Sequence, residues 1–290
     1  MLSYEGKVYR PPSEWRSLIV QATVGCSNNT CTFCGMYKED QFHIKDEESL
    51  FEELEEEARA FNGYEKIFIA DGDALCLSTD RLLRLMAKLR ELFPFCQRIG
   101  AYATALDVNR KSREDLKRLK EAGLGILYIG LETGSNELLE KIKKNMRVED
   151  YLAASEKLHQ VGIAQSVTLI TGLAGAGQSI QYARETAQVV SQMNPDYVSY
   201  LTLMLDEGSE LLEDYHQGRF QPAGPGEALE EIYVFLNHFT GKGPCIFRSN
   251  HASNYLSLAG TLPGDLDRLK GQILQTIQGE NYKDEAFRRL

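Results

Sequence analysis

The feature that most constrains this 290-residue chain is a regular alternation of short apolar runs with longer amphipathic segments. The apolar runs predict strands at 18–24, 66–70, 98–104, 125–131, 165–171 and 196–203. The amphipathic segments predict helices at 46–61, 80–93, 113–123, 136–144, 148–162 and 179–193. This alternation is typical of parallel βα units, and the strands have the continuous apolar character expected when both faces are buried.

Six successive βα units without a glycine-rich dinucleotide-binding fingerprint favour a partial (βα)6 TIM-like barrel over an open doubly wound sheet. We expect this α/β barrel core over residues 1–205. Residues 206–290 have a different pattern, with helices expected at 226–241 and 264–278 and a short strand at 244–249, and predict a C-terminal α-rich extension packed on the barrel. The loops that follow the carboxyl ends of barrel strands are where functional residues are expected.

Charge and composition restrict the class of partner. The formal charge of −10 argues against nucleic acid, which requires a basic face. The basic segments 111–120 and 141–147 are interpreted as solvated helix faces. No signal-like segment and no apolar run of about 20 residues is present, so a cytoplasmic protein without membrane contact is expected. In a reducing compartment, clustered cysteines indicate a metal or catalysis before a disulfide.

Three of the six cysteines, Cys26, Cys31 and Cys34, lie within the stretch 25-GCSNNTCTFCGMYK-38, directly after the first predicted strand. Three thiolates can bind three irons of a 4Fe–4S cluster and leave the fourth iron open, as a reactive site requires. Zinc with a remote fourth ligand such as His43 is an alternative. A redox dithiol in 31-CTFC-34 is a weaker one, because no thioredoxin-like pattern surrounds it.

Because Phe33 directly precedes the third cysteine, this loop resembles the cluster motif of the radical S-adenosylmethionine (radical SAM) superfamily. That motif is C-x3-C-x2-C after the first strand of a partial barrel, with an aromatic residue before the third cysteine. The spacing here is C-x4-C-x2-C, a variant that indicates a subgroup of unknown substrate. The resemblance covers roughly residues 16–205. It implies one oxygen-sensitive 4Fe–4S cluster per chain, held by the three cysteines, and S-adenosylmethionine as the second cofactor.

Segments at later strand ends add to the resemblance. The segment 71-DGDAL-75 stands where related enzymes carry a Gly-Gly-Glu-like sequence that holds the amino group of the cofactor. Gly72 allows a close backbone approach, and Asp71 or Asp73 offers a carboxylate. An ordinary polar turn explains these residues equally well.

Two further segments imply cofactor contacts. The segment 130-GLETGS-135 resembles a superfamily motif whose acidic position, here Glu132, reaches the ribose hydroxyls, although a helix start at Ser135 is also expected. Lys144, or Arg147 instead, stands where relatives pair a cation with the methionine carboxylate; the alternative is a surface cation at a helix end. Gly172, in 171-TGLAGAGQ-178, matches the segment that relatives place beside the adenine.

The resemblance implies a reaction. An electron from a donor such as flavodoxin or ferredoxin cleaves S-adenosylmethionine reductively, and the resulting 5′-deoxyadenosyl radical abstracts hydrogen from a substrate, here an unidentified small molecule or peptide. One alternative is a cluster- or haem-binding protein of the same fold without radical turnover. Another is a zinc-stabilised barrel.

The segment 245-CIFRSNHASNYLSLAGTLP-263 supplies the candidate catalytic or substrate-binding residues Arg248, Asn250 and His251. A loop that caps its own backbone is the alternative. Met36 stands where the anaerobic coproporphyrinogen oxidase group and its haem-binding relatives carry a further cysteine, which argues against close membership of that group. The remaining cysteines lack ligand spacing and are expected to be small buried side chains: Cys76, Cys96 and Cys245.

Overall fold

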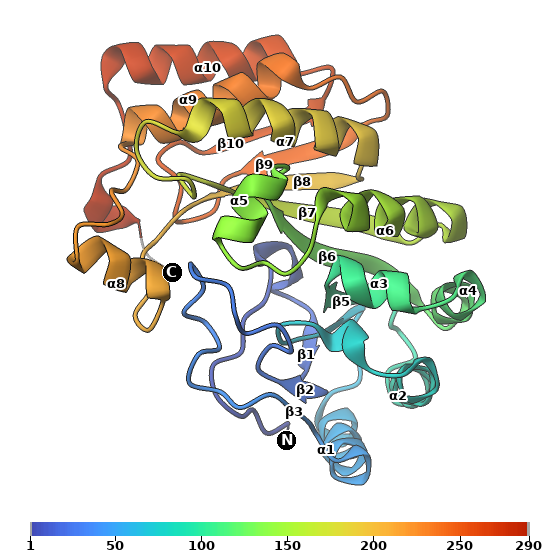
Figure 1. The fold of residues 1–290 in the computed structure, drawn as a ribbon. Coiled ribbons are helices and arrows are strands. Elements are labelled where there is room, and N and C mark those ends of the chain that lie inside the picture. Colours follow the sequence, from blue (N-terminus) through green and yellow to red (C-terminus); the bar gives the residue numbers. More distant parts are fainter. Residues whose placement is uncertain (1, 289–290) are drawn as a thin grey trace. The chain divides into compact units, whose positions relative to one another are not determined.

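The computed structural model describes residues 2–288, which divide into two compact units (Figure 1). The first unit consists of Met1–Asn29, Met36–Ile129 and Ala153–Gln165. The second consists of Thr30–Gly35, Gly130–Leu152 and Ser166–Leu290. The two units are defined by their compactness alone. The predicted boundary between barrel core and C-terminal extension, at residues 205 and 206, therefore stays a prediction.

Parallel strands of buried apolar residues form the sheet of the first unit. Their order is β1-β4-β5-β6, with parallel pairing between each pair of neighbours. The bounds are β1 Leu18–Val20, β4 Lys66–Ile69, β5 Arg98–Ala103 and β6 Leu124–Glu132, the last of which ends in the second unit. These strands coincide with the apolar runs of the sequence, because a strand buried on both faces requires continuous apolar residues.

The helices of the first unit begin at the capping residues that the sequence contains. Asp46, Ser78 and Ser112 each accept a backbone N–H from the first turn of the helix that follows. The bounds are α1 Glu47–Ala60, α2 Thr79–Leu92, α3 Ala105–Arg110 and α4 Arg113–Glu121, together with the 3-10 turns η1 Pro12–Glu14 and η2 Ala74–Cys76. The short helix α3 was not predicted; it begins with a capping box of Thr104 and Asp107.

The first predicted strand, 18–24, is broken into two. Its first part is β1, whereas its second part is β2 (Thr23–Val24), which pairs antiparallel with β3 (His43–Ile44). The break falls at the buried Gln21, whose Nε2 donates to the Glu5 carbonyl at 2.9 Å and to Asp71 Oδ2 at 2.7 Å. A buried amide requires such partners, so the chain leaves the parallel sheet there, and the cysteine loop follows β2.

The second unit contains the strands in the order β7-β8-β9-β10, of which the first three are parallel and the last is antiparallel. The strand bounds are β7 Ala164–Thr171, β8 Tyr197–Thr202, β9 Cys245–Ser249 and β10 Leu258–Leu262. The helix bounds are α5 Asn136–Lys141, α6 Val148–Val161, α7 Ser179–Met193, α8 Glu210–His216, α9 Pro225–His238, α10 Leu266–Gly279 and the 3-10 turn η3 Glu285–Phe287. β7 and α6 have residues in both units.

The two units together have a mixed α/β fold whose strands are mostly parallel, as the βα alternation predicts. Six parallel strands, β1 and β4 to β8, correspond to the six predicted βα units. None of the helices in the described part of the chain has both the length and the apolar character that a membrane crossing requires.

Candidate functional site

Cys26, in the first unit, lies against the segment that follows β4. Gly72 N–H donates to the Gly25 carbonyl at 3.1 Å. A Cβ on Gly72 would collide with the Cys26 side chain and would lie 2.8 Å from Cys26 Cα. The close backbone approach that we predicted for Gly72 therefore includes an approach to the cysteine loop itself.

Replacement of Gly72 by alanine is expected to displace the start of the cysteine loop. The added methyl group has no space, so we expect a destabilisation of about 1–3 kcal/mol in urea unfolding, with less iron taken up on reconstitution. Gly271→Ala in α10 is the matched control, because nothing lies within 4 Å of its Cβ position. Equal iron contents in the two variants would contradict the close contact.

The two carboxylates beside Gly72 have different surroundings. Asp73 accepts hydrogen bonds from the backbone N–H of Ser27 at 3.2 Å and from the Ser27 hydroxyl. Asp71, at φ +71°, accepts from Gln21, while its Oδ1 is buried and has no hydrogen-bond partner within residues 2–288. Burial raises the pKa of both carboxyls to about 6. Asp73 thus fastens the cysteine loop, and Asp71 keeps an acceptor that an ammonium group would satisfy.

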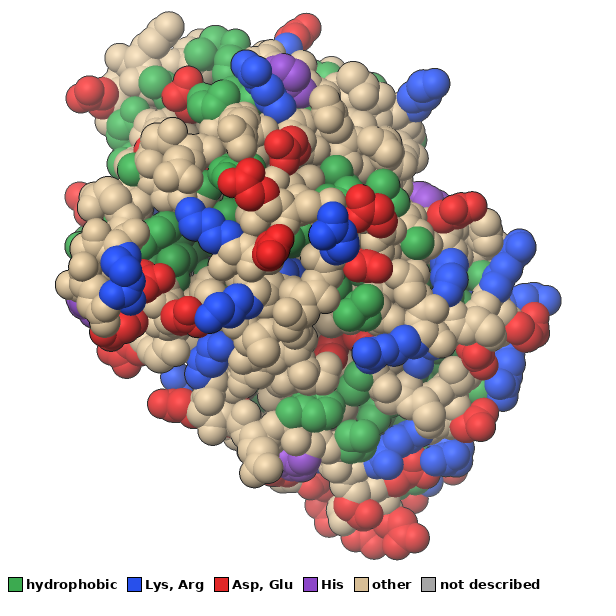
Figure 2. Space-filling model, in the orientation of Figure 1, with side chains coloured by type: hydrophobic (Ala, Val, Ile, Leu, Met, Phe, Trp, Pro, Cys, Tyr) green, Lys and Arg blue, Asp and Glu red, His purple; other side chains and the backbone are tan. Residues whose placement is uncertain are grey.

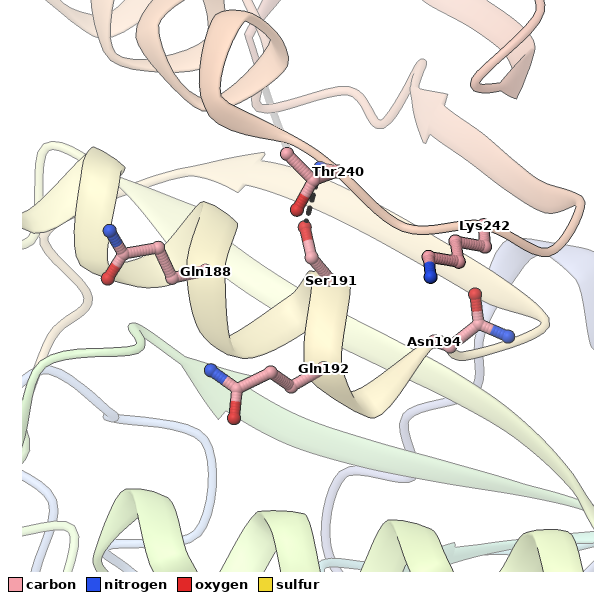
Figure 3. Close-up of a pocket in the computed structure, with 6 residues that line it drawn as sticks. All are labelled: Gln188, Ser191, Gln192, Asn194, Thr240 and Lys242. Carbon is pink, nitrogen blue, oxygen red and sulfur yellow. Dashed lines mark hydrogen bonds between the residues drawn. The ribbon is translucent and has the colours of Figure 1, made fainter.

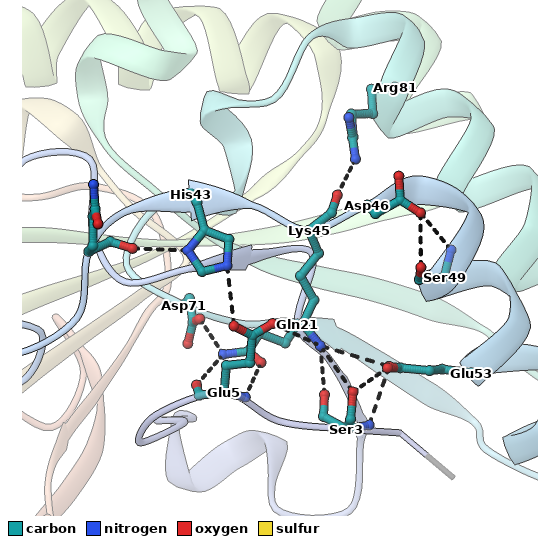
Figure 4. Close-up of polar contacts among 11 residues, drawn as sticks. Ser3, Glu5, Gln21, His43, Lys45, Asp46, Ser49, Glu53, Asp71 and Arg81 are labelled. Carbon is teal, nitrogen blue, oxygen red and sulfur yellow. Dashed lines mark hydrogen bonds and ion pairs between the residues drawn. The ribbon is translucent and has the colours of Figure 1, made fainter.

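His43, the candidate zinc ligand, has both ring nitrogens engaged (Figure 4). Its Nδ1 lies 3.0 Å from the Gln41 carbonyl, and its Nε2 lies 3.3 Å from the Glu5 carboxylate. The neighbouring Lys45 is buried and donates to the Ser3 carbonyl at 2.7 Å. These contacts fasten the N-terminal segment and give no support to His43 as a metal ligand.

Cys31 and Cys34 belong to the second unit, in the short segment 30–35. Thr32 N–H donates to the Ile142 carbonyl at 3.0 Å, and the Thr32 carbonyl accepts from Leu211 N–H at 2.8 Å. Cys31 is buried, whereas Cys34 is half-buried, as is Phe33 between them. Within residues 2–288, no three His, Cys, Asp or Glu side chains are gathered closely enough to hold a metal ion.

Glu132 and Lys144, each predicted to contact the cofactor, form a buried ion pair with one another. Lys144 Nζ lies 2.7 Å from Glu132 Oε1, and the two side chains are only 12% and 8% exposed. Burial alone lowers the pKa of Lys144, but Glu132, Tyr151 and Cys31 outweigh it and raise this pKa well above its usual value. Lys144 is therefore a cation at neutral pH.

The pair depends on an unusual backbone. Glu132 has φ +64°, a conformation that costs a non-glycine residue free energy and is found at functional sites. A Cβ on Gly130 would collide with the Glu132 carboxylate and would lie 3.2 Å from Lys144 Nζ. Arg147, the alternative cation, is exposed and pairs with Glu149 at 3.5 Å. Lys144 thus takes the buried position.

The glycine-rich loop after β7 is held by α9. Gly172, at φ +76°, donates its N–H to Glu231 Oε2 at 2.8 Å, and Gly177 N–H donates to Glu227. Ala176 N–H donates to the Gln221 carbonyl at 2.8 Å. Glu231 is buried, and this burial raises its pKa from 4.5 to about 8.

The raised pKa of Glu231 makes stability depend on pH. The native state binds this proton more tightly than the unfolded chain, so its contribution is complete below about pH 4.5 and is lost as the pH rises towards 8. Between pH 6 and 8 we expect the free energy of unfolding to fall by about 2 kcal/mol from this group. Asp71 and Asp73, with pKa values of about 6, act mainly at lower pH.

Urea unfolding at pH 6, 7 and 8 measures this dependence. Glu231→Gln keeps an acceptor for Gly172 N–H but cannot titrate, so its stability curve should be flatter than that of the wild type over this range. Glu227→Gln, at a partly exposed neighbour, should retain the wild-type slope. Parallel curves for the wild type and Glu231→Gln would contradict a buried, neutral Glu231.

The candidates from 245–263 divide into two groups. Arg248 and Asn250 are exposed, whereas His251 is half-buried. Ser253 N–H donates to His251 Nδ1 at 3.2 Å, so Nδ1 is an acceptor and Nε2 carries the proton. Burial and the nearby Lys283 lower the pKa of His251. His251 is therefore a neutral donor through Nε2.

Asn254, in the same segment, has a structural role. Its Oδ1 accepts a hydrogen bond from the Thr202 hydroxyl at 3.0 Å, and its Nδ2 donates to the Tyr200 carbonyl at 2.8 Å. The residue is buried. Arg288 donates to the Ser253 carbonyl at 2.6 Å. Asn254 thus fastens this segment to the end of β8, and the self-capping loop stays an alternative.

The second unit has a hollow of about 460 Å³ that none of these residues lines (Figure 3). It is bordered by the C-terminal half of α7 and by Thr240 and Lys242, and Ser191 accepts from Thr240 N–H at 2.8 Å. Side-chain amides, hydroxyls and the Lys242 ammonium group line it.

Parallel βα units and a three-cysteine loop after the first of them define a class of iron–sulfur proteins built on a partial barrel. The profile of the Radical SAM superfamily matches residues 20–190, which is more than half of the chain. The chain belongs to the Radical SAM superfamily. The predicted family, fold class and cofactors are thus confirmed, since this superfamily uses a 4Fe–4S cluster and S-adenosylmethionine.

Individual relatives are distant. Heme chaperone HemW of Bacillus subtilis is 26% identical over 171 residues, which are 59% of this chain and 44% of HemW. A tRNA uridine(34) acetyltransferase of Methanocaldococcus infernus is 27% identical over 124 residues, which are 42% of this chain and 23% of that protein. The chain thus spans less than half the length of either relative.

Among solved structures, coproporphyrinogen III oxidase (HemN) of Escherichia coli has a TM-score of 0.56 at 19% identity. The similarity covers 76% of this chain and 52% of HemN. At this identity the likeness concerns the fold alone, and it agrees with the predicted partial barrel.

Several site residues could not be recognised from the sequence. Gly130 lies in a segment that we singled out, but its role depends on the position of Lys144. Ser27 and Glu231 carry no motif, and Glu231 lies 59 residues from its partner Gly172. A glutamate in the middle of an apolar helix face, in 228-ALEEIYVFL-236, is the one signal that could have indicated it.

Proposed function

We propose that this protein is a radical SAM enzyme in which Cys26, Cys31 and Cys34 ligate one 4Fe–4S cluster. The observation that carries the proposal is the presence of three cysteines within nine residues, in the loop that follows β1 and β2, in a chain that belongs to this superfamily. Thiols fit the iron atoms of such a cluster. The buried Asp71 oxygen without a partner fits the amino group of S-adenosylmethionine.

The bound cluster and cofactor would supply the one-electron chemistry that cleaves S-adenosylmethionine and activates a substrate C–H bond. The chain's own residues contribute binding and orientation. Lys144 would attract the cofactor carboxylate, Glu132 would orient Lys144 or accept from the ribose hydroxyls, and Gly172 would allow close approach to the adenine. His251 would donate a hydrogen bond through Nε2 without accepting a proton.

A small molecule or peptide is the proposed substrate. Acidic side chains are interspersed among the Lys and Arg side chains on the face shown in Figure 2, and the net charge is −10. Such a surface does not favour the phosphate contacts that dominate nucleic-acid affinity. The electron donor would be a flavodoxin or a ferredoxin, which are the usual one-electron partners of this superfamily.

Anaerobic reconstitution with iron and sulfide tests the proposal. Addition of dithionite and S-adenosylmethionine should give 5′-deoxyadenosine and methionine, with a cluster visible by its thiolate-to-iron absorption. Stoichiometric zinc in anaerobically purified protein, together with no iron uptake, would overturn it in favour of the zinc-stabilised barrel.

A haem-handling protein without turnover is the second candidate. It is favoured by the similarity to HemW, whose name describes a haem chaperone. Met36, at the position of a further cysteine in that group, speaks against it. A haem titration followed by absorption decides: saturable binding of one haem per chain without 5′-deoxyadenosine supports the second candidate, and no haem binding with 5′-deoxyadenosine supports the first.

A further inference from the structure

The strands of the second unit have two different faces. From Val167 onwards in β7, and along β8 and β9, alternate residues are buried, and the residues between them are partly or fully exposed. The buried face packs against α9: the ring of Tyr200 lies 5.1 Å from that of Phe235 in α9 and 6.2 Å from that of Phe247 (Figure 1). The more exposed residues therefore point to the opposite face.

A polar row crosses this opposite face. The strand register places Thr168 beside Ser199 and Ser199 beside Arg248, so these three side chains are neighbours on adjacent parallel strands. Neither the Thr168 nor the Ser199 hydroxyl makes a side-chain hydrogen bond within residues 2–288. Two hydroxyls without a side-chain hydrogen bond thus stand beside one guanidinium.

Arg248 has no acid beside it, unlike several arginines on the strands and helices of this chain. Arg84 forks onto Glu47 at 2.7 and 3.0 Å, and Arg98 pairs with the buried Glu14. In the described part of the chain, Arg248 makes a single hydrogen bond, from Nη1 to the Phe247 carbonyl at 3.0 Å, and no ion pair. Its remaining N–H groups are available to an external acceptor.

We propose that Arg248, with the Thr168 and Ser199 hydroxyls, binds a carboxylate group of the substrate. A guanidinium forks onto two carboxylate oxygens through parallel N–H bonds, and adjacent hydroxyls satisfy the other lone pairs. This inference rests on the proposed function, because it takes the carboxylic acid bound by Arg248, Thr168 and Ser199 to be the substrate of the radical reaction.

The neighbouring rows favour a carboxylic acid over a phosphate ester. The next row towards the carboxyl ends of the strands consists of Ile170 and Leu201, which are apolar and half-buried. The polar row contains one cation, which balances the single charge of a carboxylate but not the charge of about −1.5 to −2 on a phosphate monoester. The expected substrate is a carboxylic acid with an apolar body that lies along Ile170 and Leu201.

Three probes of similar shape test the inference on the anaerobically reconstituted full chain in the presence of S-adenosylmethionine. Benzoate, phenyl phosphate and benzamide are titrated by saturation-transfer NMR against the wild type, Arg248→Gln, Arg248→Lys and Arg84→Gln. We expect benzoate to bind more tightly than phenyl phosphate, and benzamide not to bind. Arg248→Gln should weaken benzoate about ten- to hundredfold, Arg248→Lys less, and Arg84→Gln not at all.

Iron content and S-adenosylmethionine binding are measured on the same samples. Unchanged values in Arg248→Gln, with benzoate binding lost, support the proposal. A loss of S-adenosylmethionine binding would assign Arg248 to the cofactor and overturn it, as would equal benzoate affinities in the wild type and Arg248→Gln. Tighter binding of phenyl phosphate would replace the carboxylate with a phosphate. If Arg248→Gln loses benzoate binding but even the wild type never forms 5′-deoxyadenosine, the carboxylate site stands and only the proposed radical function is refuted.

Discussion

Replacement of Cys26, Cys31 and Cys34 together by alanine is expected to leave the reconstituted protein without cluster iron. A 4Fe–4S cluster depends on thiolates for attachment, so the iron content should fall from about four per chain to near zero, and formation of 5′-deoxyadenosine should cease. The thiolate-to-iron absorption should disappear with the iron. Colorimetric iron analysis and absorption spectra of anaerobic samples measure both effects.

Two controls separate ligation from folding. Cys96→Ala removes a thiol whose Sγ lies 3.5 Å from the Arg98 carbonyl, outside the three-cysteine loop, and should keep its full iron content. Circular dichroism and thermal unfolding of the triple variant should remain close to those of the iron-free wild type, because a cysteine thiol behaves as a small apolar group that alanine largely replaces. A triple variant that still takes up about four irons per chain would refute ligation by this loop.

Local sequence patterns were sufficient for most of the fold. Apolar runs predicted the parallel strands because burial on both faces leaves few other residue types acceptable. Ser112 predicted the start of α4 through its capping hydrogen bond. The break between β1 and β2 was not predictable, because it depends on Asp71 and Glu5 as partners of Gln21, at 50 and 16 residues' distance in the chain. The two-residue strand β3 is too short to have a periodicity.

The site was predictable in its order along the chain but not in its contacts. Motifs indicated Glu132 and Lys144 separately, each as a ligand of the cofactor. Their ion pair depends on the positive φ of Glu132, which no pattern in 130-GLETGS-135 reveals. The sequence predicted that Asp71 or Asp73 offers a carboxylate to an ammonium group, and it did not indicate that Asp73 accepts hydrogen bonds from Ser27. A polar residue in a motif indicates that a partner exists, and only the tertiary structure decides whether that partner belongs to the chain.

The pairing of Glu132 with Lys144 makes each of them costly to remove alone. Glu132→Gln leaves a buried cation and Lys144→Met leaves a buried carboxylate, so each single variant should lose about 3–5 kcal/mol in urea unfolding. The double variant Glu132→Gln/Lys144→Met buries no charge at this position. It should therefore be more stable than either single variant, with a coupling free energy of about 2 kcal/mol or more.

Cofactor binding separates the structural role of this pair from its proposed functional role. If Lys144 attracts the carboxylate of S-adenosylmethionine, equilibrium dialysis should show weaker binding in Lys144→Met and in the double variant alike, although the double variant regains stability. The matched control is the neighbouring ion pair of Lys143 and Glu210, in which Lys143 Nζ lies 2.7 Å from Glu210 Oε1. The two side chains of this pair are 53% and 50% exposed. Lys143→Met should change stability by less than about 1 kcal/mol and leave cofactor binding intact. Recovery of cofactor binding together with stability in the double variant would instead confine the pair to a structural role.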